Sequence, residues 1–240
     1  MGGIGRVVRM AGIGRTGSAG IGCTGSTGIG GIGRIGSGDD TVTSFSPGFQ
    51  GRGRRLADRL PPGQYPTESF PVLSAGPTPR VPTETWSFTV TTELGATHSW
   101  TWDEMMALPQ QETTHDIHCV TRWSKFDTQW RGVPLDAFLE DVETAADYAV
   151  VSSYGGYTTN LPLEGLLDGK AWIVHTYDGH PLSPEHGGPA RLLVPHLYFW
   201  KSAKWVRGLT LTHEDEPGFW ESVGYHNYGD PWREQRNWGD

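Results

Sequence analysis

Apolar residues occupy every second position at Trp86, Phe88 and Val90, and polar residues fill the positions between them. Side chains of a strand point alternately to its two faces, so this period of two predicts a half-buried β-strand. Residues 93–95 are typical of a turn, and the pattern over 98–102 predicts a returning strand. The segment is therefore expected to form a β-hairpin.

Short helices and strands are predicted along the next part of the chain. Asp103 is suited to cap a helix over 103–108, which Pro109 then ends because proline cannot continue a helix. Residues 113–120 have the pattern of a strand, and a second short helix is predicted over 134–139.

More strands and long irregular connections follow. A Gly-hinged loop at 154–160, suited to line a cleft, is expected to precede a short helix at 161–167. The aromatic segment from residue 213 onward is expected to be irregular and to fold back through packing contacts. Buried strands are predicted at 149–153, 171–177, 192–194 and 206–211. The predicted class is α+β, with a mixed β-sheet, short helices and long irregular connections.

Glycine dominates the beginning of the chain, so residues 1–50 are interpreted as a low-complexity, disordered tail. Residues 12–17 fit G-x-G-x-x-G, but that motif indicates a dinucleotide site only between a strand and a helix, and neither pattern is visible here. Residues 51–82 are first basic and then rich in proline, which favours an extended lead-in. Residues 83–240, which contain all 11 tryptophans, are predicted to form one domain.

Charge and cysteine usage argue against several classes of protein. The formal net charge of −8 argues against a general nucleic-acid binder, which usually has a basic face. Two cysteines, one of them in the glycine-rich tail, provide no disulfide framework and no Cys₄ zinc site. No apolar run reaches the roughly 20 residues that a membrane-spanning helix needs. Because the N-terminus has neither a secretory nor a twin-arginine pattern, a cytoplasmic location is predicted.

Cys119 stands at the end of the predicted strand and is flanked by His118 and Arg122. Positive charge and hydrogen-bond donors favour the thiolate, which is the form of cysteine that binds metals. A buried structural cysteine is the alternative, because free cysteine is among the most buried residue types. A zinc or Cys–His hydrolase site that includes His115 is disfavoured, because neighbouring side chains of a strand point to opposite faces.

A second dense motif runs over residues 186–211 as H-G-G-P-A-R-L-L-V-P-H-L-Y-F-W-K-S-A-K-W-V-R-G-L-T-L. Lys201, Lys204 and Arg207 occur together here, with glycine and serine nearby. Ammonium groups and turn amides converge on phosphate, so the motif is suited to bind an anion. A solvated basic surface loop is the alternative.

From Cys119 the chain reads C-V-T-R-W-S-K-F-D-T-Q-W-R-G-V-P, which resembles the molybdopterin-binding domain of the sulfite oxidase family. The resemblance includes H-G-G-P-A-R at 186–191 and G-F-W-E-S-V-G-Y-H at 218–226. It covers roughly residues 60–240 and points to the compact, haem-free bacterial branch, which includes the catalytic subunit of a periplasmic methionine sulfoxide reductase. A sulfite-oxidase-type molybdopterin-binding fold is thereby implied.

The resemblance implies roles for individual residues. Cys119 is the expected molybdenum ligand, because soft sulfur suits a thiophilic metal. His118 and Arg122 are expected to influence the surroundings of the metal or to meet an anionic substrate. The alternative for both is an ordinary pair at the end of a strand that faces solvent. The expected cofactor contacts are Phe70, Ser153, His186, Arg191, Lys201, Ser202, Ala203 through its backbone, and Lys204.

The implied function is that of a molybdenum–molybdopterin enzyme without haem, which transfers an oxygen atom to or from a small sulfur or nitrogen oxo substrate. The cofactor then supplies the redox chemistry, and the protein supplies binding and orientation. An electron-transfer partner is implied, whereas a nucleic-acid partner and a membrane span are not. The alternative is a non-catalytic module that binds pterin or another anion, and the molybdenum content of the purified protein would separate the two.

Overall fold

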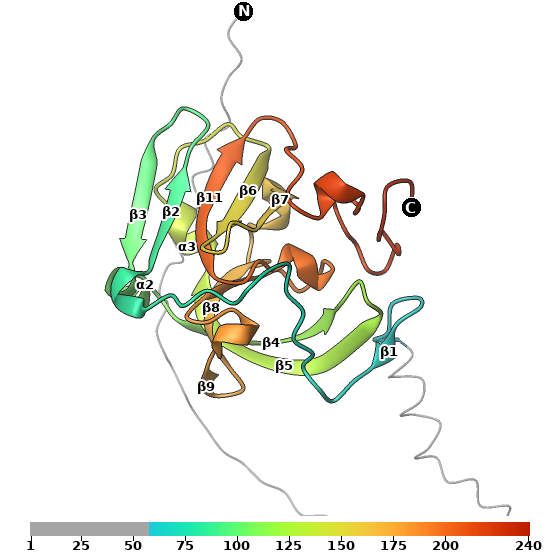
Figure 1. The fold of residues 1–240 in the computed structure, drawn as a ribbon. Helices are drawn as coiled ribbons and strands as arrows, with labels where there is room; N and C mark the ends of the chain where they lie inside the picture. The colour runs from blue at the N-terminus through green and yellow to red at the C-terminus, as the bar shows by residue number, and fades with distance from the viewer. Residues whose placement is uncertain (1–57) are drawn as a thin grey trace, which may run out of the picture.

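The computed structural model describes residues 58–240, which form two β-sheets with a few short helices (Figure 1). This is the α+β class that the sequence predicts. The expectations for residues 1–50, including the G-x-G-x-x-G run, and for the basic residues 51–57 lie outside the described residues.

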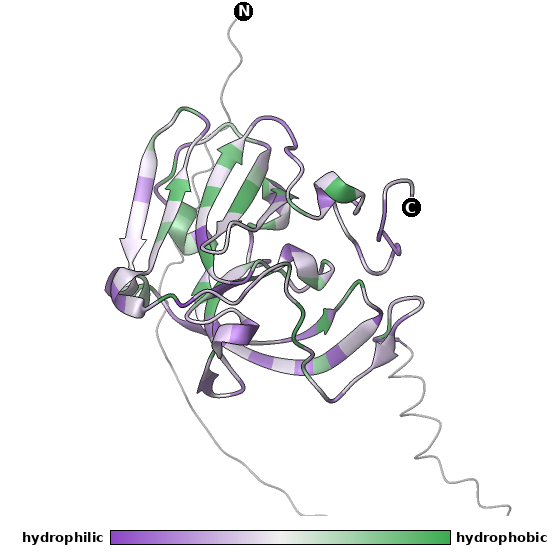
Figure 2. Ribbon diagram, viewed as in Figure 1, coloured by the Kyte–Doolittle hydropathy of each residue, from purple (hydrophilic) through white to green (hydrophobic). Residues whose placement is uncertain are grey.

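The first sheet has five strands and contains the predicted hairpin. Its order is β3 (Thr97–Thr101), β2 (Ser87–Thr91), β11 (Val206–Thr212), β6 (Tyr148–Ser153) and β7 (Thr158–Pro162). The pair β2–β11 is parallel and the other neighbours are antiparallel, so the sheet is mixed. Phe88 and Val90 are buried, as their alternation predicts. Figure 2 shows hydrophobic residues along β2, β11 and β6, whereas the edge strand β3 is pale with a hydrophilic stretch.

The second sheet includes a long strand that the sequence-based expectations lack. The sheet order is β1 (Tyr65–Pro66), β5 (Trp123–Pro134), β8 (Trp172–Tyr177) and β10 (Arg191–Leu193), with β4 (Gln111–His118) on β5 and β9 (His180–Pro181) on β8. A Cβ at Gly132 of β5 would lie 2.2 Å from the carbonyl oxygen of Ile173. Only glycine therefore allows β5 and β8 to approach this closely.

The helices are short, as expected. They are η1 (Thr83–Thr85), α2 (Trp102–Ala107), α3 (Asp136–Leu139), η2 (Leu163–Gly165), η3 (Pro184–His186), η4 (Phe199–Lys201) and η5 (Glu221–Val223). The cap of α2 is Thr101 rather than the expected Asp103, because Thr101 and Glu104 exchange the two hydrogen bonds of a capping box. Among the described residues, no helix has the length and apolar character that crossing a membrane requires.

Residues 154–167 differ from the expected loop and helix. The structure places β7 over Thr158–Pro162, paired antiparallel with β6, and only a single 3₁₀ turn follows. Thr159, Asn160 and Leu161 are buried in this strand. A short run that mixes polar and apolar types, such as 158–162, gives little periodicity. Pairing with β6 therefore decides that this run is a strand.

The lead-in is extended and crosses the front of the molecule from β1 towards β2 (Figure 1). Arg59 anchors its start through ion pairs with Asp116 and Asp127, and its guanidinium lies 4.5 Å from the centre of the Phe126 ring. The lead-in thereby reaches the end of β4, where Cys119 is located.

Two hydrophobic clusters hold the sheets together. The larger cluster lies under the five-stranded sheet and includes Phe88 and Phe138, whose ring centres are 5.0 Å apart. The smaller cluster belongs to the second sheet and includes Cys119, Trp123 and Trp130. The cysteine therefore packs into an aromatic cluster of the second sheet.

Candidate functional site

A cavity of about 400 Å³ lies beside Cys119. Parts of five chain segments line it, within residues 70–77, 119–123, 155–157, 186–205 and 219–225. Segments that are distant in sequence thus converge on one site, and the volume falls in the usual range for small-molecule sites.

The thiol of Cys119 opens onto this cavity from a tight turn that follows β4. The Cys119 N–H donates to the Trp123 carbonyl at 2.9 Å, and the Arg122 N–H donates to the Cys119 carbonyl at 2.9 Å. The Thr121 hydroxyl donates to Sγ at 3.1 Å. Cys119 is 7% exposed, and burial raises the pKa of its thiol. A bound metal reverses that preference, because it stabilises the thiolate.

Both ends of the described chain hold this turn in place. Gln64 of the lead-in donates from Nε2 to the Cys119 carbonyl at 3.0 Å. Arg236 of the C-terminal segment donates from Nη1 to the Val120 carbonyl at 2.6 Å. Because the backbone is fixed from two sides, the direction of the thiol is set before any ligand binds.

Arg191 supplies a buried positive charge to the same cavity. Its guanidinium donates to the carbonyls of His186 at 2.9 Å and Ser202 at 2.5 Å, and lies 4.1 Å from the centre of the Phe199 ring. Among the described residues it forms no ion pair. Burial lowers the pKa of Arg191 to about 9. A buried guanidinium without a carboxylate partner is suited to receive an anion.

Lys204 lies next to Arg191. Its Nζ donates to the carbonyls of Leu73 and Glu185, both at 2.6 Å. Burial, and then the charge of Arg191, lower the pKa of Lys204 to about 8. The backbone of Gly187 has a φ of +107°, and a Cβ there would lie 3.0 Å from Lys204 Cβ and 3.1 Å from Arg191 Cβ. Glycine therefore leaves room for the two cations to converge.

His186 and Phe70 form one corner of the cavity. Their rings stack with centres 4.0 Å apart, and His186 Nε2 is hydrogen-bonded to the Phe70 carbonyl at 3.1 Å. The structure thus brings together most of the site residues expected from the sequence. Those that line the cavity are Phe70, Cys119, His186, Arg191, Ser202, Ala203 and Lys204.

Four expected site residues, among them His118, Arg122 and Ser153, do not line the cavity. His118 is hydrogen-bonded through Nδ1 to the Ser124 hydroxyl at 2.8 Å, and burial lowers its pKa to about 4. Arg122 is exposed, with a φ of +79° in the turn. Ser153 is buried within β6, outside the cavity lining.

Lys201 is the fourth of these residues. It is fully buried, and its Nζ lies 2.6 Å from Glu221 Oε1. It also donates to the carbonyls of Asn160 at 2.7 Å and Asn227 at 2.6 Å. All the directions of its ammonium are occupied by protein oxygens, so Lys201 serves the fold, and Lys204 faces the cavity.

Several lining residues were not expected to touch a ligand. Phe219, Trp220 and Tyr225 form a wall from the C-terminal segment, for which only packing was expected. The G-F-W-E-S-V-G-Y-H motif contains all three and was the available signal. The expectation that the Gly-hinged loop lines a cleft is confirmed by Gly155 and Gly156.

The zinc alternative finds no support in the described part of the chain. No group of three or more His, Cys, Asp or Glu side chains there is arranged to hold a metal ion. His115 instead forms a hydrogen bond from Nε2 to the Thr113 hydroxyl at 2.6 Å.

Comparison with known proteins agrees with this geometry. The family described as the oxidoreductase molybdopterin binding domain matches residues 75–220. The uncharacterized oxidoreductase YuiH of Bacillus subtilis (strain 168) is 44% identical over 181 residues, which are 74% of this chain and 91% of that protein. The protein-methionine-sulfoxide reductase catalytic subunit MsrP of Pseudomonas syringae pv. tomato is 25% identical over 169 residues, which are 61% of this chain and 49% of MsrP.

A solved structure shares the fold. The sulfane dehydrogenase SoxCD of Paracoccus pantotrophus superposes with a TM-score of 0.56 at 18% identity, over 68% of this chain and 46% of that one. The chain therefore spans nearly the whole of YuiH and about half of MsrP and of the SoxCD chain.

Proposed function

The chain belongs to the oxidoreductase molybdopterin binding domain family within the sulfite oxidase group, and on this premise we propose which reaction it performs and with which residues. Membership makes the protein a molybdopterin-binding oxidoreductase. The proposed reaction is oxygen-atom transfer to or from a small sulfur or nitrogen oxo substrate, of the sulfite or sulfoxide type. The observation that carries the proposal is that Cys119 shares a cavity with Arg191, a buried cation that has no acidic partner among the described residues.

Cys119 and the residues around it suit the role of the cysteine as a molybdenum ligand. Sulfur is a soft donor, and Cys119 faces the cavity from a turn that Gln64 and Arg236 hold in place. Thr121 already donates a hydrogen bond to Sγ, which stabilises negative charge on the sulfur. A thiolate in this position would be the residue that holds the metal.

The other end of the cavity fits the anionic part of the cofactor. Arg191 and Lys204 provide two positive charges, and the backbone around Ser202 and Ala203 lines the same region. A phosphate here would give Arg191 the anionic partner that residues 58–240 do not supply. His186 is fixed by Phe70 and closes the side of this region.

The bound cofactor supplies a metal that gains or loses two electrons as an oxygen atom moves. The chain binds and orients this group and keeps bulk water away. Trp123, Trp200 and Trp220 line the cavity with large apolar rings, so charge that develops near Cys119 interacts strongly with the groups around it.

The test replaces Cys119 by alanine in the full chain. Wild-type protein is expected to purify with molybdenum stoichiometric to the chain and to transfer oxygen atoms to or from a sulfur oxo substrate. Cys119→Ala is expected to retain pterin, because Arg191 and Lys204 remain, and to lose nearly all turnover.

Thr121→Val provides the control for the loss of the thiolate itself, because it removes the hydrogen bond to Sγ and keeps the sulfur. It is expected to stay active at a reduced rate. Full turnover in Cys119→Ala would contradict the role given to the cysteine. Pterin bound without any turnover in the wild type would support the non-catalytic module instead.

The electron partner and the location belong to the proposal as well. The reaction needs a protein or small molecule that exchanges two electrons with the enzyme. A cytoplasmic location is consistent with a chain of only two cysteines. Cell fractionation followed by immunodetection tests this part, and recovery from the periplasm would contradict it.

A further inference from the structure

We propose that Arg236 is a positioning residue of this site. It ties the turn of Cys119 to the C-terminal wall of the cavity, and its positive charge raises the reduction potential of the metal that the cysteine binds. This inference rests on the proposed function and adds to it a residue that does not line the cavity. Its basis is the set of contacts made by the side chain and the backbone of Arg236.

The guanidinium of Arg236 meets three separate parts of the chain. Nη1 donates to the carbonyl of Val120, the residue directly after Cys119, at 2.6 Å. Nη2 donates to the Pro62 carbonyl of the lead-in at 3.3 Å, and Cζ lies 4.9 Å from the centre of the Tyr198 ring. A planar fork with five N–H donors can make these contacts at once, whereas a lysine ammonium is a single point charge.

The backbone around Arg236 is tied to the aromatic wall of the cavity. The Arg236 carbonyl accepts a hydrogen bond from the His226 N–H at 3.2 Å, and Asn237 forms a β-bridge with Tyr225. Tyr225 lines the cavity and stacks on Trp220 with ring centres 5.0 Å apart. Arg236 therefore connects the turn that carries the thiol with the wall that the C-terminal segment supplies.

The positive charge of Arg236 lies beside the cysteine. The side chain is half-buried, and the carbonyl that it binds belongs to the residue next to Cys119. Burial raises the pKa of the Cys119 thiol, and the charge of Arg236 is among the influences that oppose this rise. A cation close to a metal ligand stabilises the more electron-rich state of the metal. The reduction potential is therefore expected to be higher with Arg236 than without it.

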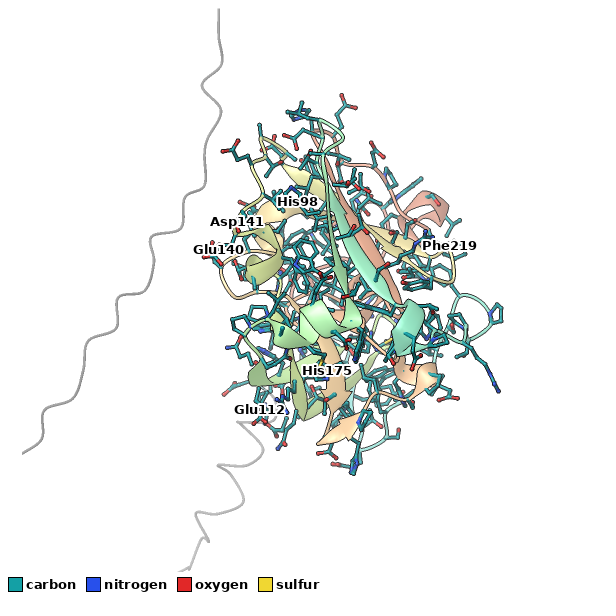
Figure 3. The ribbon with its side chains drawn as sticks, turned by 90° about the vertical axis from the view of Figure 1, so that its left-hand side faces the viewer. His98, Glu112, Glu140, Asp141, His175 and Phe219 are labelled. Carbon is teal, nitrogen blue, oxygen red and sulfur yellow. The ribbon has the colours of Figure 1, made fainter. Side chains whose placement is uncertain are left out.

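No acid within residues 58–240 forms an ion pair with Arg236. Glu234 and Asp240 belong to the same segment, but both are exposed, so water and salt screen their charges. Glu140, at the end of α3, lies on the opposite side of the molecule from Phe219 of the C-terminal segment (Figure 3). The charge of Arg236 can therefore act on the sulfur.

Arg236 differs from the two basic residues Arg191 and Lys204, which line the cavity. Under the proposed function these two residues meet the phosphate of the cofactor, whose negative charge compensates theirs. Arg236 is outside the lining, so it keeps its charge beside the turn when the cofactor is bound.

The test measures the reduction potential of the bound molybdenum in the full-length holoenzyme, by redox titration with EPR detection. Arg236→Gln removes the charge and keeps an amide donor. It is expected to lower the equilibrium constant for one-electron reduction about tenfold, which corresponds to about 59 mV. Arg236→Lys keeps the charge and is expected to change this constant less than about twofold.

Arg233→Gln is the matched control. Arg233 is exposed on the same segment and does not line the cavity. The variant removes the same charge from the segment, and its potential is expected to equal that of the wild type. A shift in Arg233→Gln as large as that in Arg236→Gln would show that only the net charge of the protein matters, which would overturn the inference.

The outcomes separate this inference from the proposed function. An unchanged potential in Arg236→Gln would overturn the inference while the proposed function stands. If Arg236→Gln purifies without molybdenum, the metal content of Arg236→Lys decides. Molybdenum in Arg236→Lys supports the role of the charge, whereas its absence shows a purely structural role and overturns the inference. Wild-type protein without molybdenum would overturn the proposed function, and the inference with it.

Hydrogen exchange in the cofactor-free protein tests the positioning role. The Arg122 N–H donates to the Cys119 carbonyl within the turn. Its exchange is expected to be at least about threefold faster in Arg236→Gln and in Arg236→Lys than in the wild type, because both variants lose the fork that holds the turn. Arg233→Gln is expected to exchange at the wild-type rate. Wild-type exchange in both Arg236 variants would overturn the positioning role.

Discussion

Two buried cations of this protein, ten residues apart in sequence, differ in the partner that each one has. Lys201 is paired with Glu221, whereas within the described part of the chain Arg191 is hydrogen-bonded only to carbonyl groups. A buried charge with an acid beside it is neutralised within the protein, and one without an acid favours an external anion. The partner, rather than the residue type, therefore separates a structural cation from a binding cation.

Lys204 makes anion binding depend on pH. Its pKa is lowered to about 8, so the ammonium is mostly protonated at about pH 7 and mostly neutral at about pH 9. Only the protonated form attracts an anion, so affinity is expected to fall as pH rises through about 8. Sulfate is the probe for cofactor-free protein, because its own charge is constant over this range.

Calorimetric titration with sulfate between about pH 7 and about pH 9 measures the effect. In Lys204→Gln the affinity is expected to be lower at neutral pH and to change little up to about pH 8, above which loss of charge from Arg191, whose pKa is lowered to about 9, weakens binding as well. A wild-type affinity that is the same at both ends of the range would contradict the role of Lys204.

At the scale of elements, local signals decide some boundaries and sheet pairing decides others. The hairpin of β2 and β3 follows directly from the alternation at Phe88 and Val90. In contrast, β7 exists because its backbone pairs with β6, which no local pattern indicates. The same reason applies to β5, whose Gly132 is understood only when β8 is beside it.

The identification of Thr101 as the cap of α2 can be tested by mutation. Thr101→Ala removes the hydroxyl that accepts from the Glu104 N–H and is expected to cost about 1 kcal/mol of unfolding free energy. Asp103→Ala removes only a favourable charge from the first turn and is expected to cost about 0.3 kcal/mol. Urea denaturation of both variants measures the loss of unfolding free energy in each. A larger loss in Asp103→Ala than in Thr101→Ala would show that Asp103 is the cap of α2.

At the scale of the whole molecule, the site depends on segments far apart in the chain. Gln64 and Arg236 hold the turn of Cys119 from the two ends of the described chain. β1 and the C-terminal segment lie on the same side of the molecule (Figure 1). The Lys201–Glu221 ion pair attaches the C-terminal aromatic wall to the rest of the fold.

The buried ion pair between Lys201 and Glu221 leads to a prediction about the free energy of unfolding. Lys201→Met leaves the buried Glu221 carboxylate without its cation and is expected to cost about 3–5 kcal/mol. Adding Glu221→Gln removes the unpaired charge, while the amide oxygen can still accept from Thr159 and Trp200, as Glu221 Oε1 does at 2.7 and 2.9 Å. The double variant is therefore expected to be more stable than Lys201→Met in urea denaturation. A double variant that is no more stable would show that the pair contributes little.

The sequence by itself determined the hairpin, the α+β class, the family and the position of Cys119 at a strand end. Each of these follows from residues close together in the chain. Only the tertiary structure decided that Lys204 rather than Lys201 faces the cavity, and that Phe219 and Tyr225 line it. These outcomes depend on which groups meet across long stretches of chain, because a buried side chain takes its role from the partner that packing brings to it.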